Sequence, residues 1–148
     1  MVEVLVAIHN VFRWVALIAA FAAVGTAWQG VLSKRAYTRG DRLRSVALVA
    51  SMHTQLLLGL VLYGLSPIVR SGFADMSTAM STRGIRFFVV EHIFLMIVAV
   101  AVIQAGSIMA KKADDDAKKH KRGAIFYTVG LLLVLGGIPW FRPLFPGL

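Results

Sequence analysis

Apolar residues run along the chain in four long stretches, and the charged residues gather between them. The stretches cover residues 4–32, 46–66, 87–110 and 124–140. A bilayer core of about 30 Å needs roughly 20 helical residues, and each stretch is close to that length. Because the apolar residues are continuous rather than alternating, the pattern predicts helices and not the strands of a membrane barrel. We therefore expect an all-α, integral membrane, up-and-down four-helix bundle that forms a single transmembrane domain over residues 1–148.

Composition agrees with a membrane protein, since 58% of the residues are hydrophobic and only 16% are charged. The net charge of +9 does not indicate a nucleic-acid partner, because most of the basic residues lie in the first and third connections between the stretches. These are Lys34, Arg35, Arg39, Arg42, Arg44, Lys111, Lys112, Lys118, Lys119, Lys121 and Arg122. By the positive-inside rule both connections are cytoplasmic and both termini lie outside. We expect the basic connections to contact anionic lipid head groups.

Polar side chains inside the apolar stretches are the candidates for function. They are His9, Arg13, His53, Gln55, Glu91, His92 and Gln104. Ionisable groups cost about 2.5–3.5 kcal/mol each at a bilayer centre, so we expect them to face the bundle interior. His120 lies at the mouth of the fourth stretch, which gives each predicted helix one histidine. Imidazole binds iron well, and a chain without cysteine cannot attach a c-type haem, so a noncovalent haem b is the expected cofactor.

Depth in the bilayer selects among the four histidines. His9 lies about 9 Å and His92 about 12 Å from the outer ends of their helices, at 1.5 Å per residue. His53 lies about 20 Å from the outer end of its helix, and His120 lies at the cytoplasmic edge. His9 and His92 are therefore the preferred iron ligands of one haem. His53 and His120 are kept as a second pair for a second haem.

Three further residues are predicted to surround the preferred histidine pair. Arg13 lies one helical turn from His9, and Arg86 lies at the outer rim, where a guanidinium can bind an anionic haem propionate. Met96 lies one turn from His92 and can pack against a porphyrin, although a methionine of the helix core is the commoner explanation.

Glu91 has two interpretations. We favour an ion pair with Arg13, or a hydrogen bond that orients an imidazole on a neighbouring helix, because buried carboxylates usually have partners. The alternative is a proton acceptor beside a quinol site, with a carboxyl pKa raised by burial.

Short motifs carry a resemblance to a known family. They are "HNVFRW" at 9–14, "HTQLLLGLVLY" at 53–63, "RFFVVEH" at 86–92 and "HKR" at 120–122. They are similar to small bacterial four-helix membrane proteins described as cytochrome b, and the arrangement resembles the cytochrome b561 type. The resemblance implies a bacterial inner membrane protein that binds haem b and exchanges electrons with quinones or a redox partner. It implies ligands among His9, His53, His92 and His120, although His120 lies nearer a helix end than in that type.

Three classes of function remain open. The preferred one is a membrane haem b electron-transfer protein that exchanges electrons with quinol or a respiratory partner, either as a quinol-linked oxidoreductase or as an electron-transfer subunit. The second is an accessory subunit of a larger respiratory or photosynthetic complex, with histidines that bind haem or chlorophyll. The third is a transporter whose proton path uses Arg13, Glu91 and the histidines.

Overall fold

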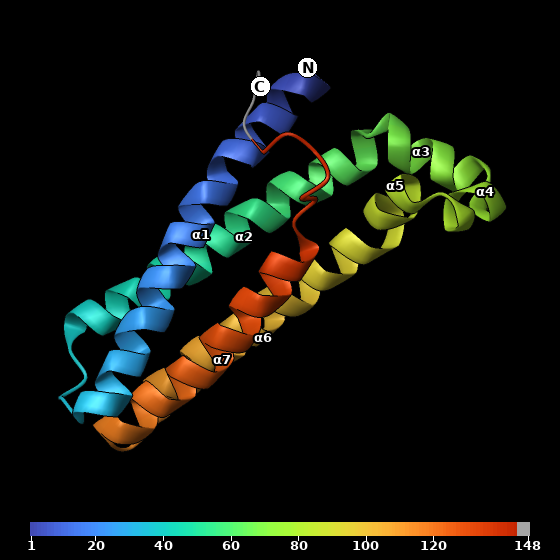
Figure 1. Cartoon of the computed structure of the whole chain (residues 1–148). Coiled ribbons are helices and arrows are strands. Elements are labelled where there is room, and N and C mark those ends of the chain that lie inside the picture. The colour runs from blue at the N-terminus through green and yellow to red at the C-terminus, as the bar shows by residue number, and fades with distance from the viewer. Residues whose placement is uncertain (145–148) are drawn as a thin grey trace.

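The computed structural model describes residues 1–144, and these are almost entirely helical. Four long helices run in alternating directions: α1 (Val2–Ser33), α2 (Arg39–Leu65), α6 (His92–Lys112) and α7 (Asp116–Gly137) (Figure 1). Three short helices, α3 (Pro67–Ala74), α4 (Met76–Ser81) and α5 (Arg83–Arg86), and a π-helical turn, η1 (Phe87–Glu91), connect α2 to α6. No strand occurs within the described residues. The predicted all-α class is confirmed.

Within residues 1–144, three helical segments are long and apolar enough to cross a membrane. They are Val2–Ser33, Arg39–Leu65 and Arg83–Lys112, the last of which includes α5, η1 and α6. The fourth long helix, α7, is not among them, since basic residues occupy its first turns and its apolar part ends at Gly137. The structure therefore does not confirm the fourth membrane-spanning helix that was predicted over residues 124–140.

Helix ends differ from the sequence prediction where side chains cap them. Helix α2 begins at Arg39 rather than near residue 46, because Thr38 and Asp41 form a reciprocal capping box. Helix α7 begins at Asp116 rather than near residue 124, because the Asp115 side chain accepts a hydrogen bond from the Lys118 backbone N–H. Both caps lie in charged segments that apolar periodicity does not include.

Small residues let the long helices approach closely. Helix α7 packs against both α1 and α6, and α2 packs against α1 and α6. A Cβ atom added to Gly130 of α7 would lie 2.3 Å from Ile103 Cγ1 of α6, and one added to Gly106 would lie 2.3 Å from Phe126 Cβ. Such distances leave no room for a side chain, so these glycines set the separation of α6 and α7.

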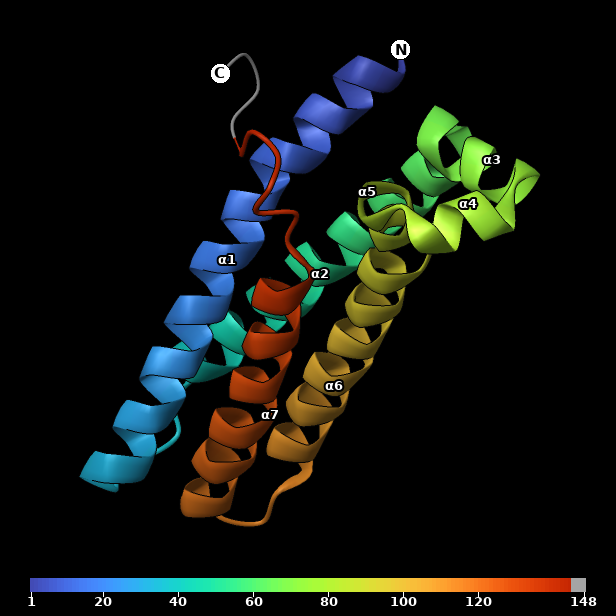
Figure 2. The ribbon, with the colours of Figure 1, turned by 45° about the vertical axis from the view of Figure 1, so that its right-hand side comes forward.

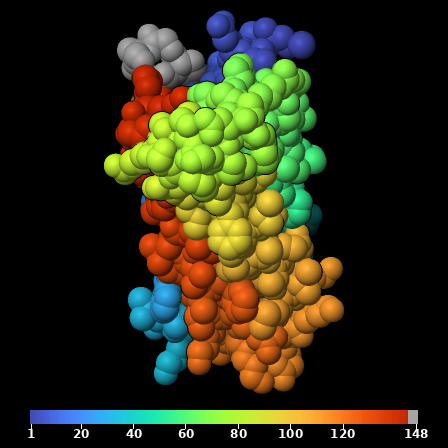
Figure 3. Space-filling view, turned by 90° about the vertical axis from the view of Figure 1, so that its right-hand side faces the viewer, coloured from blue at the N-terminus to red at the C-terminus, as the bar shows by residue number. Residues whose placement is uncertain are grey.

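The two ends of the molecule differ in content. The N-terminus, the short helices α3–α5 and the described C-terminal segment 138–144 lie together at one end, which we call the cavity end (Figures 1 and 2). The connections 34–38 and 113–115 lie at the opposite end, which we call the basic end. The segment that contains α3 and α4 covers the outside of the cavity end over α6 (Figure 3). The basic end holds eleven of the sixteen Lys and Arg residues of the chain.

Candidate functional site

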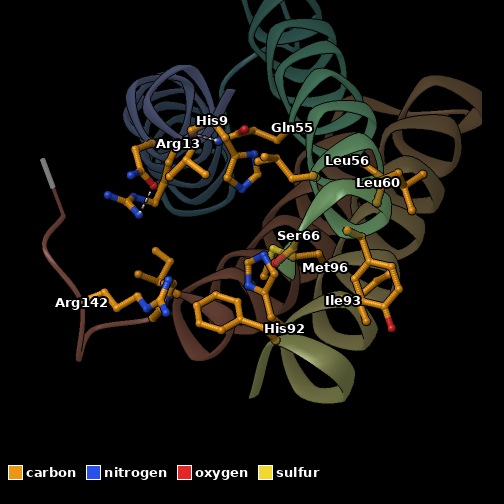
Figure 4. A pocket seen from close by; sticks show the side chains of 18 of the residues that line it. His9, Arg13, Gln55, Leu56, Leu60, Ser66, His92, Ile93, Met96 and Arg142 are labelled. Atoms are coloured by element: carbon orange, nitrogen blue, oxygen red, sulfur yellow. Dashed lines mark hydrogen bonds between the residues drawn. The ribbon is translucent and has the colours of Figure 1, made fainter. Parts of the chain in front are cut away.

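A cavity of about 200 Å³ opens between the helices at the cavity end. Its walls come from α1, α2, α3, η1, α6 and α7, and from residues 138–143. Most of the lining is apolar, as in ligand pockets generally. The polar side chains of the lining are His9, Asn10, Arg13, Gln55, Tyr63, Ser66, His92 and Arg142. His9 and His92 face one another across this space (Figure 4).

The π-helical turn η1 positions His92. The backbone N–H of His92 donates to the carbonyl of Phe87, five residues earlier, instead of four. A π turn inserts an extra residue into the helix and rotates every side chain after it, and such turns occur frequently at functional sites. The prediction of a regular helix over residues 87–110 missed this turn, because an apolar run does not reveal the hydrogen-bond register.

The distance between the imidazole rings of His9 and His92 indicates what the site can bind. Their ring centres lie 6.3 Å apart, and the ring planes are 79° apart. A metal–imidazole bond measures about 2 Å, and the ligating nitrogen lies about 1 Å from its ring centre. Two such ligands on opposite sides of one metal ion therefore place their ring centres about 6 Å apart. The pair has the spacing that two axial ligands of one iron require.

A hydrogen bond at Nδ1 leaves the other ring nitrogen of His92, Nε2, available to bind a metal ion. His92 Nδ1 lies 2.6 Å from the carbonyl oxygen of Gly137, so the ring carries its proton on Nδ1 and donates it to that oxygen. A metal-binding histidine usually donates its second nitrogen to a carbonyl or carboxylate, which fixes the tautomer and the ring orientation. Gly137, at the end of α7, is thus a supporting residue that sequence reasoning did not identify.

His9 is held differently. Its Nδ1 atom is buried without a hydrogen-bond partner, and the same is true of the Oε1 atom of Gln55 on α2. The other amide atom of Gln55, Nε2, donates to the backbone carbonyl of His9 over 3.0 Å. A buried polar atom without a partner costs about 1–3 kcal/mol, so two such atoms beside one cavity indicate a site arranged for a ligand.

Two guanidinium groups border the cavity. Arg13 is only 8% exposed, and it donates to Asn10 Oδ1 over 3.3 Å and to the backbone carbonyl of Leu144, while its Nε atom is buried without a partner. Arg142 lies over the ring of Phe88, with 4.5 Å from its Cζ atom to the ring centre. Neither arginine has a carboxylate within salt-bridge distance among residues 1–144. An anionic ligand group would neutralise the buried positive charge of Arg13, whereas Arg142 is exposed.

The predicted partner of Glu91 is wrong. Glu91 forms an ion pair with Arg86, with 2.7 Å between Arg86 Nε and Glu91 Oε1, and not with Arg13. Both side chains are about two-fifths exposed, at 42% for Arg86 and 40% for Glu91. Neither residue is part of the cavity lining. Arg86 therefore lies apart from the site for which it was predicted, and Arg142 occupies the cavity wall instead.

The structure does not bring His53 and His120 together. His53 is exposed on the outside of α2, and its Nδ1 atom lies 2.9 Å from the Val49 carbonyl of the same helix. His120 is 1% exposed at the basic end, where its ring packs against Gly30 and lies 5.2 Å from the ring of Tyr37. A second haem between these two histidines has no geometric support in the described residues.

Met96 lines the cavity beside His92, and its methyl group packs against Gly137. Within residues 1–144 no group of three or more His, Asp or Glu side chains is placed to hold a metal ion. A haem iron needs only axial ligands from the protein, so a pair of histidines fits this cofactor and not a bare metal ion. Comparison of the chain with family models, with curated proteins and with solved structures finds no match.

Proposed function

We propose that this protein is an integral membrane cytochrome that holds one haem b between His9 and His92. The observation that carries the proposal is the 6.3 Å separation of the two imidazole rings across a largely apolar cavity. When bound, a haem supplies one-electron transfer at its iron. The protein supplies two neutral imidazoles, an apolar environment, and the Gly137 carbonyl that fixes the tautomer of His92.

A membrane location is part of the proposal. The long helices expose apolar side chains on their outer surfaces, including Ile18, Phe21, Leu57, Phe94 and Leu132. Large exposed apolar areas mark a surface that lipid or another protein covers. The charge distribution would place the basic end in the cytoplasm of a bacterium and the cavity end near the outer face of its inner membrane. We infer a bundle of four helices, with α7 shielded from lipid on the sides where α1 and α6 pack.

The buried arginine favours haem over chlorophyll. Arg13 lines the cavity without a carboxylate, and haem b carries free propionate groups, whereas the corresponding propionate of chlorophyll is esterified. A charge-assisted hydrogen bond from a guanidinium to a propionate is among the stronger polar contacts in proteins. Arg13 and Arg142 are therefore the residues that would hold the propionates.

The transporter alternative receives less support from the packing. Leu48, Ile103 and Leu131 are buried between the cavity and the polar residues of the basic end, with at most 6% exposure. A proton path needs polar side chains or water along its whole length, and this layer is apolar. Electron exchange with quinol or with a respiratory partner at the cavity end needs no such path.

The visible spectrum of the purified protein tests the proposal. A Soret band with a sharp α band after reduction is expected, at one haem per chain. Far-red absorption would indicate chlorophyll, and absence of any cofactor after growth with a haem precursor would contradict the proposal.

The Arg13→Gln variant tests the propionate contact separately. We expect it to retain haem about tenfold less well, which corresponds to a loss of about 1.4 kcal/mol. Arg86→Gln is the matched control, because Arg86 lies outside the cavity and pairs with Glu91. Equal haem loss in both variants would show that Arg13 has no specific contact with the cofactor.

A further inference from the structure

The tyrosine that lines the cavity is bonded to the π turn. Tyr63, near the end of α2, donates from its hydroxyl to the backbone carbonyl of Val89 over 2.7 Å. Val89 belongs to the π turn η1 and is 4% exposed. The backbone bonds of a π turn depart from the regular helix register, and in apolar surroundings a neighbouring helix has to supply partners for the carbonyl groups that this frees. Tyr63 supplies such a partner from α2.

The side chain of Val89 is fixed by α3. A Cβ atom added to Gly72 of α3 would lie 2.5 Å from Val89 Cγ2, so the missing side chain at this position lets α3 approach the π turn closely. The ring of Tyr63 also contacts α3, because it lies edge-on to the ring of Phe73 with 6.2 Å between the ring centres. Tyr63 and Gly72 therefore fix the carbonyl and the side chain of the same residue.

The π turn itself contacts the ring of His92. Phe87 and Phe88, two residues of the turn, pack against this imidazole with ring-centre distances of 5.9 and 6.0 Å. On a regular α-helix, residues five apart point about 140° away from one another, so Phe87 and His92 would not meet. In the π turn the His92 N–H donates to the Phe87 carbonyl across five positions, which brings the two residues onto the same face. The contact between Phe87 and His92 therefore depends on the π register.

We infer that Tyr63 is a positioning residue for His92. Its hydroxyl holds the π turn in register, and the turn holds the imidazole ring that faces His9. Loss of the hydroxyl frees the Val89 carbonyl, so the turn can relax towards a regular helix in which Phe87 leaves the imidazole. The orientation of the ring is a property of the free protein, whereas its consequence for an iron ligand rests on the proposed function.

Nitrogen NMR of the histidine side chains tests the inference in cofactor-free protein. The wild-type His92 imidazole is expected to be a single tautomer with its proton on Nδ1, which lies 2.6 Å from the Gly137 carbonyl oxygen. Tyr63→Phe removes the hydroxyl and keeps the ring that packs on Phe73. This variant is expected to shift the His92 nitrogen signals and to populate the second tautomer. Unchanged His92 signals would overturn the inference, whether or not the protein binds haem.

Tyr127→Phe is the matched control, since it removes a buried tyrosine hydrogen bond at the basic end and leaves the π turn untouched. Its His92 signals are expected to match the wild type. Equal changes in Tyr63→Phe and Tyr127→Phe would show a general loosening of the bundle and would overturn the inference.

Gly72→Ala tests the same turn with the Tyr63 hydroxyl in place. The added methyl group would lie 2.5 Å from Val89 Cγ2, so the turn has to move. This variant is expected to shift the His92 signals as well, and it replaces Tyr63→Phe if that variant does not fold. Wild-type signals in Gly72→Ala would show that the turn does not control the ring, which would also overturn the inference.

With haem bound, the EPR spectrum of the ferric protein gives a readout that a change in stability alone does not move. The g values of a low-spin iron with two imidazole ligands depend on the angle between the imidazole planes, which are 79° apart here. Tyr63→Phe is expected to keep one haem per chain and to shift the largest g value, whereas Tyr127→Phe keeps the wild-type spectrum. Wild-type g values in Tyr63→Phe would overturn the inference. A protein that binds no haem would contradict the proposed function alone, and the NMR comparison would still decide the role of Tyr63.

Discussion

Buried polar groups at the basic end contact one another, whereas those at the cavity end leave atoms without partners. Ser45 Oγ shares a hydrogen bond of 2.5 Å with the Tyr127 hydroxyl and donates to Ser107 Oγ over 2.8 Å. Arg35 binds Asp41 through two hydrogen bonds of 2.7 Å each. Burial raises the pKa of the neighbouring Tyr37 to about 12, so its hydroxyl stays protonated at any physiological pH.

At the cavity end, His9 Nδ1, Arg13 Nε and Gln55 Oε1 are buried without partners. A satisfied polar network fixes how helices pack, while an unsatisfied one costs free energy unless a ligand completes it. The comparison is consistent with a structural role for the basic end and with the proposed ligand site at the cavity end. The difference between the two ends is not complete, because His120 Nδ1 at the basic end is also buried without a partner.

Replacement of His9 or His92, the proposed iron ligands, should have the largest effect at the cavity end. His9→Ala and His92→Ala are each expected to abolish haem binding, because apolar contacts alone hold a porphyrin weakly. His53→Ala is the control, since its side chain is exposed outside the cavity, and it should keep the full haem content. The number of haems per chain, measured from the α band of the reduced protein, tests this prediction. If His120→Ala and His9→Ala each remove half of the haem, two haems are bound and the one-haem arrangement is wrong.

Removal of the Tyr127 hydroxyl at the basic end should lower the stability of the protein without affecting cofactor binding. Tyr127→Phe loses the hydrogen bond to Ser45, and we expect it to lower the free energy of unfolding by about 1–2 kcal/mol. The exposed Thr54 hydroxyl bonds only its own helix, so Thr54→Val should stay within about 0.5 kcal/mol of the wild type. Denaturation in detergent measures both variants. Loss of haem from folded Tyr127→Phe protein would contradict the separation of the two ends.

Gln55 offers a sharper test of how the cavity end orients its ligand. With haem bound, we expect the Nδ1–H of His9 to donate to Gln55 Oε1, because both atoms are buried beside the cavity without other partners. Such a bond increases the basicity of the imidazole and favours ferric iron. Gln55→Leu should therefore raise the midpoint potential by roughly 30–60 mV, equivalent to about 0.7–1.4 kcal/mol for one electron. Gln104→Leu is the control, since Gln104 does not line the cavity. An unchanged potential in haem-loaded Gln55→Leu protein would exclude this role.

The smallest effect is expected at Glu91. A buried pair with Arg13 would cost about 3–5 kcal/mol when broken, but the observed pair with Arg86 is exposed and is worth about 0–1 kcal/mol. Glu91→Gln should thus leave the Tm nearly unchanged, and Arg86→Gln should behave alike. A slower reduction of the haem by quinol in Glu91→Gln alone would restore the proton-acceptor interpretation. Wild-type stability and kinetics together would mean that Glu91 has neither role.

Apolar runs and charge positions alone determined several features of this protein. The long continuous runs require helices, because only a helix satisfies its own backbone hydrogen bonds within one apolar segment. The concentration of Lys and Arg in two connections distinguishes one end of the molecule from the other. The similar depths of His9 and His92 predicted that these two residues form a pair, and the tertiary structure places their ring centres 6.3 Å apart.

Tertiary structure alone decided which way each polar side chain faces. The long helices are apolar on nearly all sides, so their sequences do not reveal which face is buried, and His53 lies on the exposed side of α2. The π turn at Phe87–Glu91 changes the rotation of the side chains that follow it, and Glu91 pairs with Arg86 rather than with Arg13. Arg142 lines the cavity and the Gly137 carbonyl accepts a hydrogen bond from His92, and such contacts between residues distant in sequence depend on packing. Local sequence sets the helices, whereas their rotation and contacts are set by the free energy of the whole assembly.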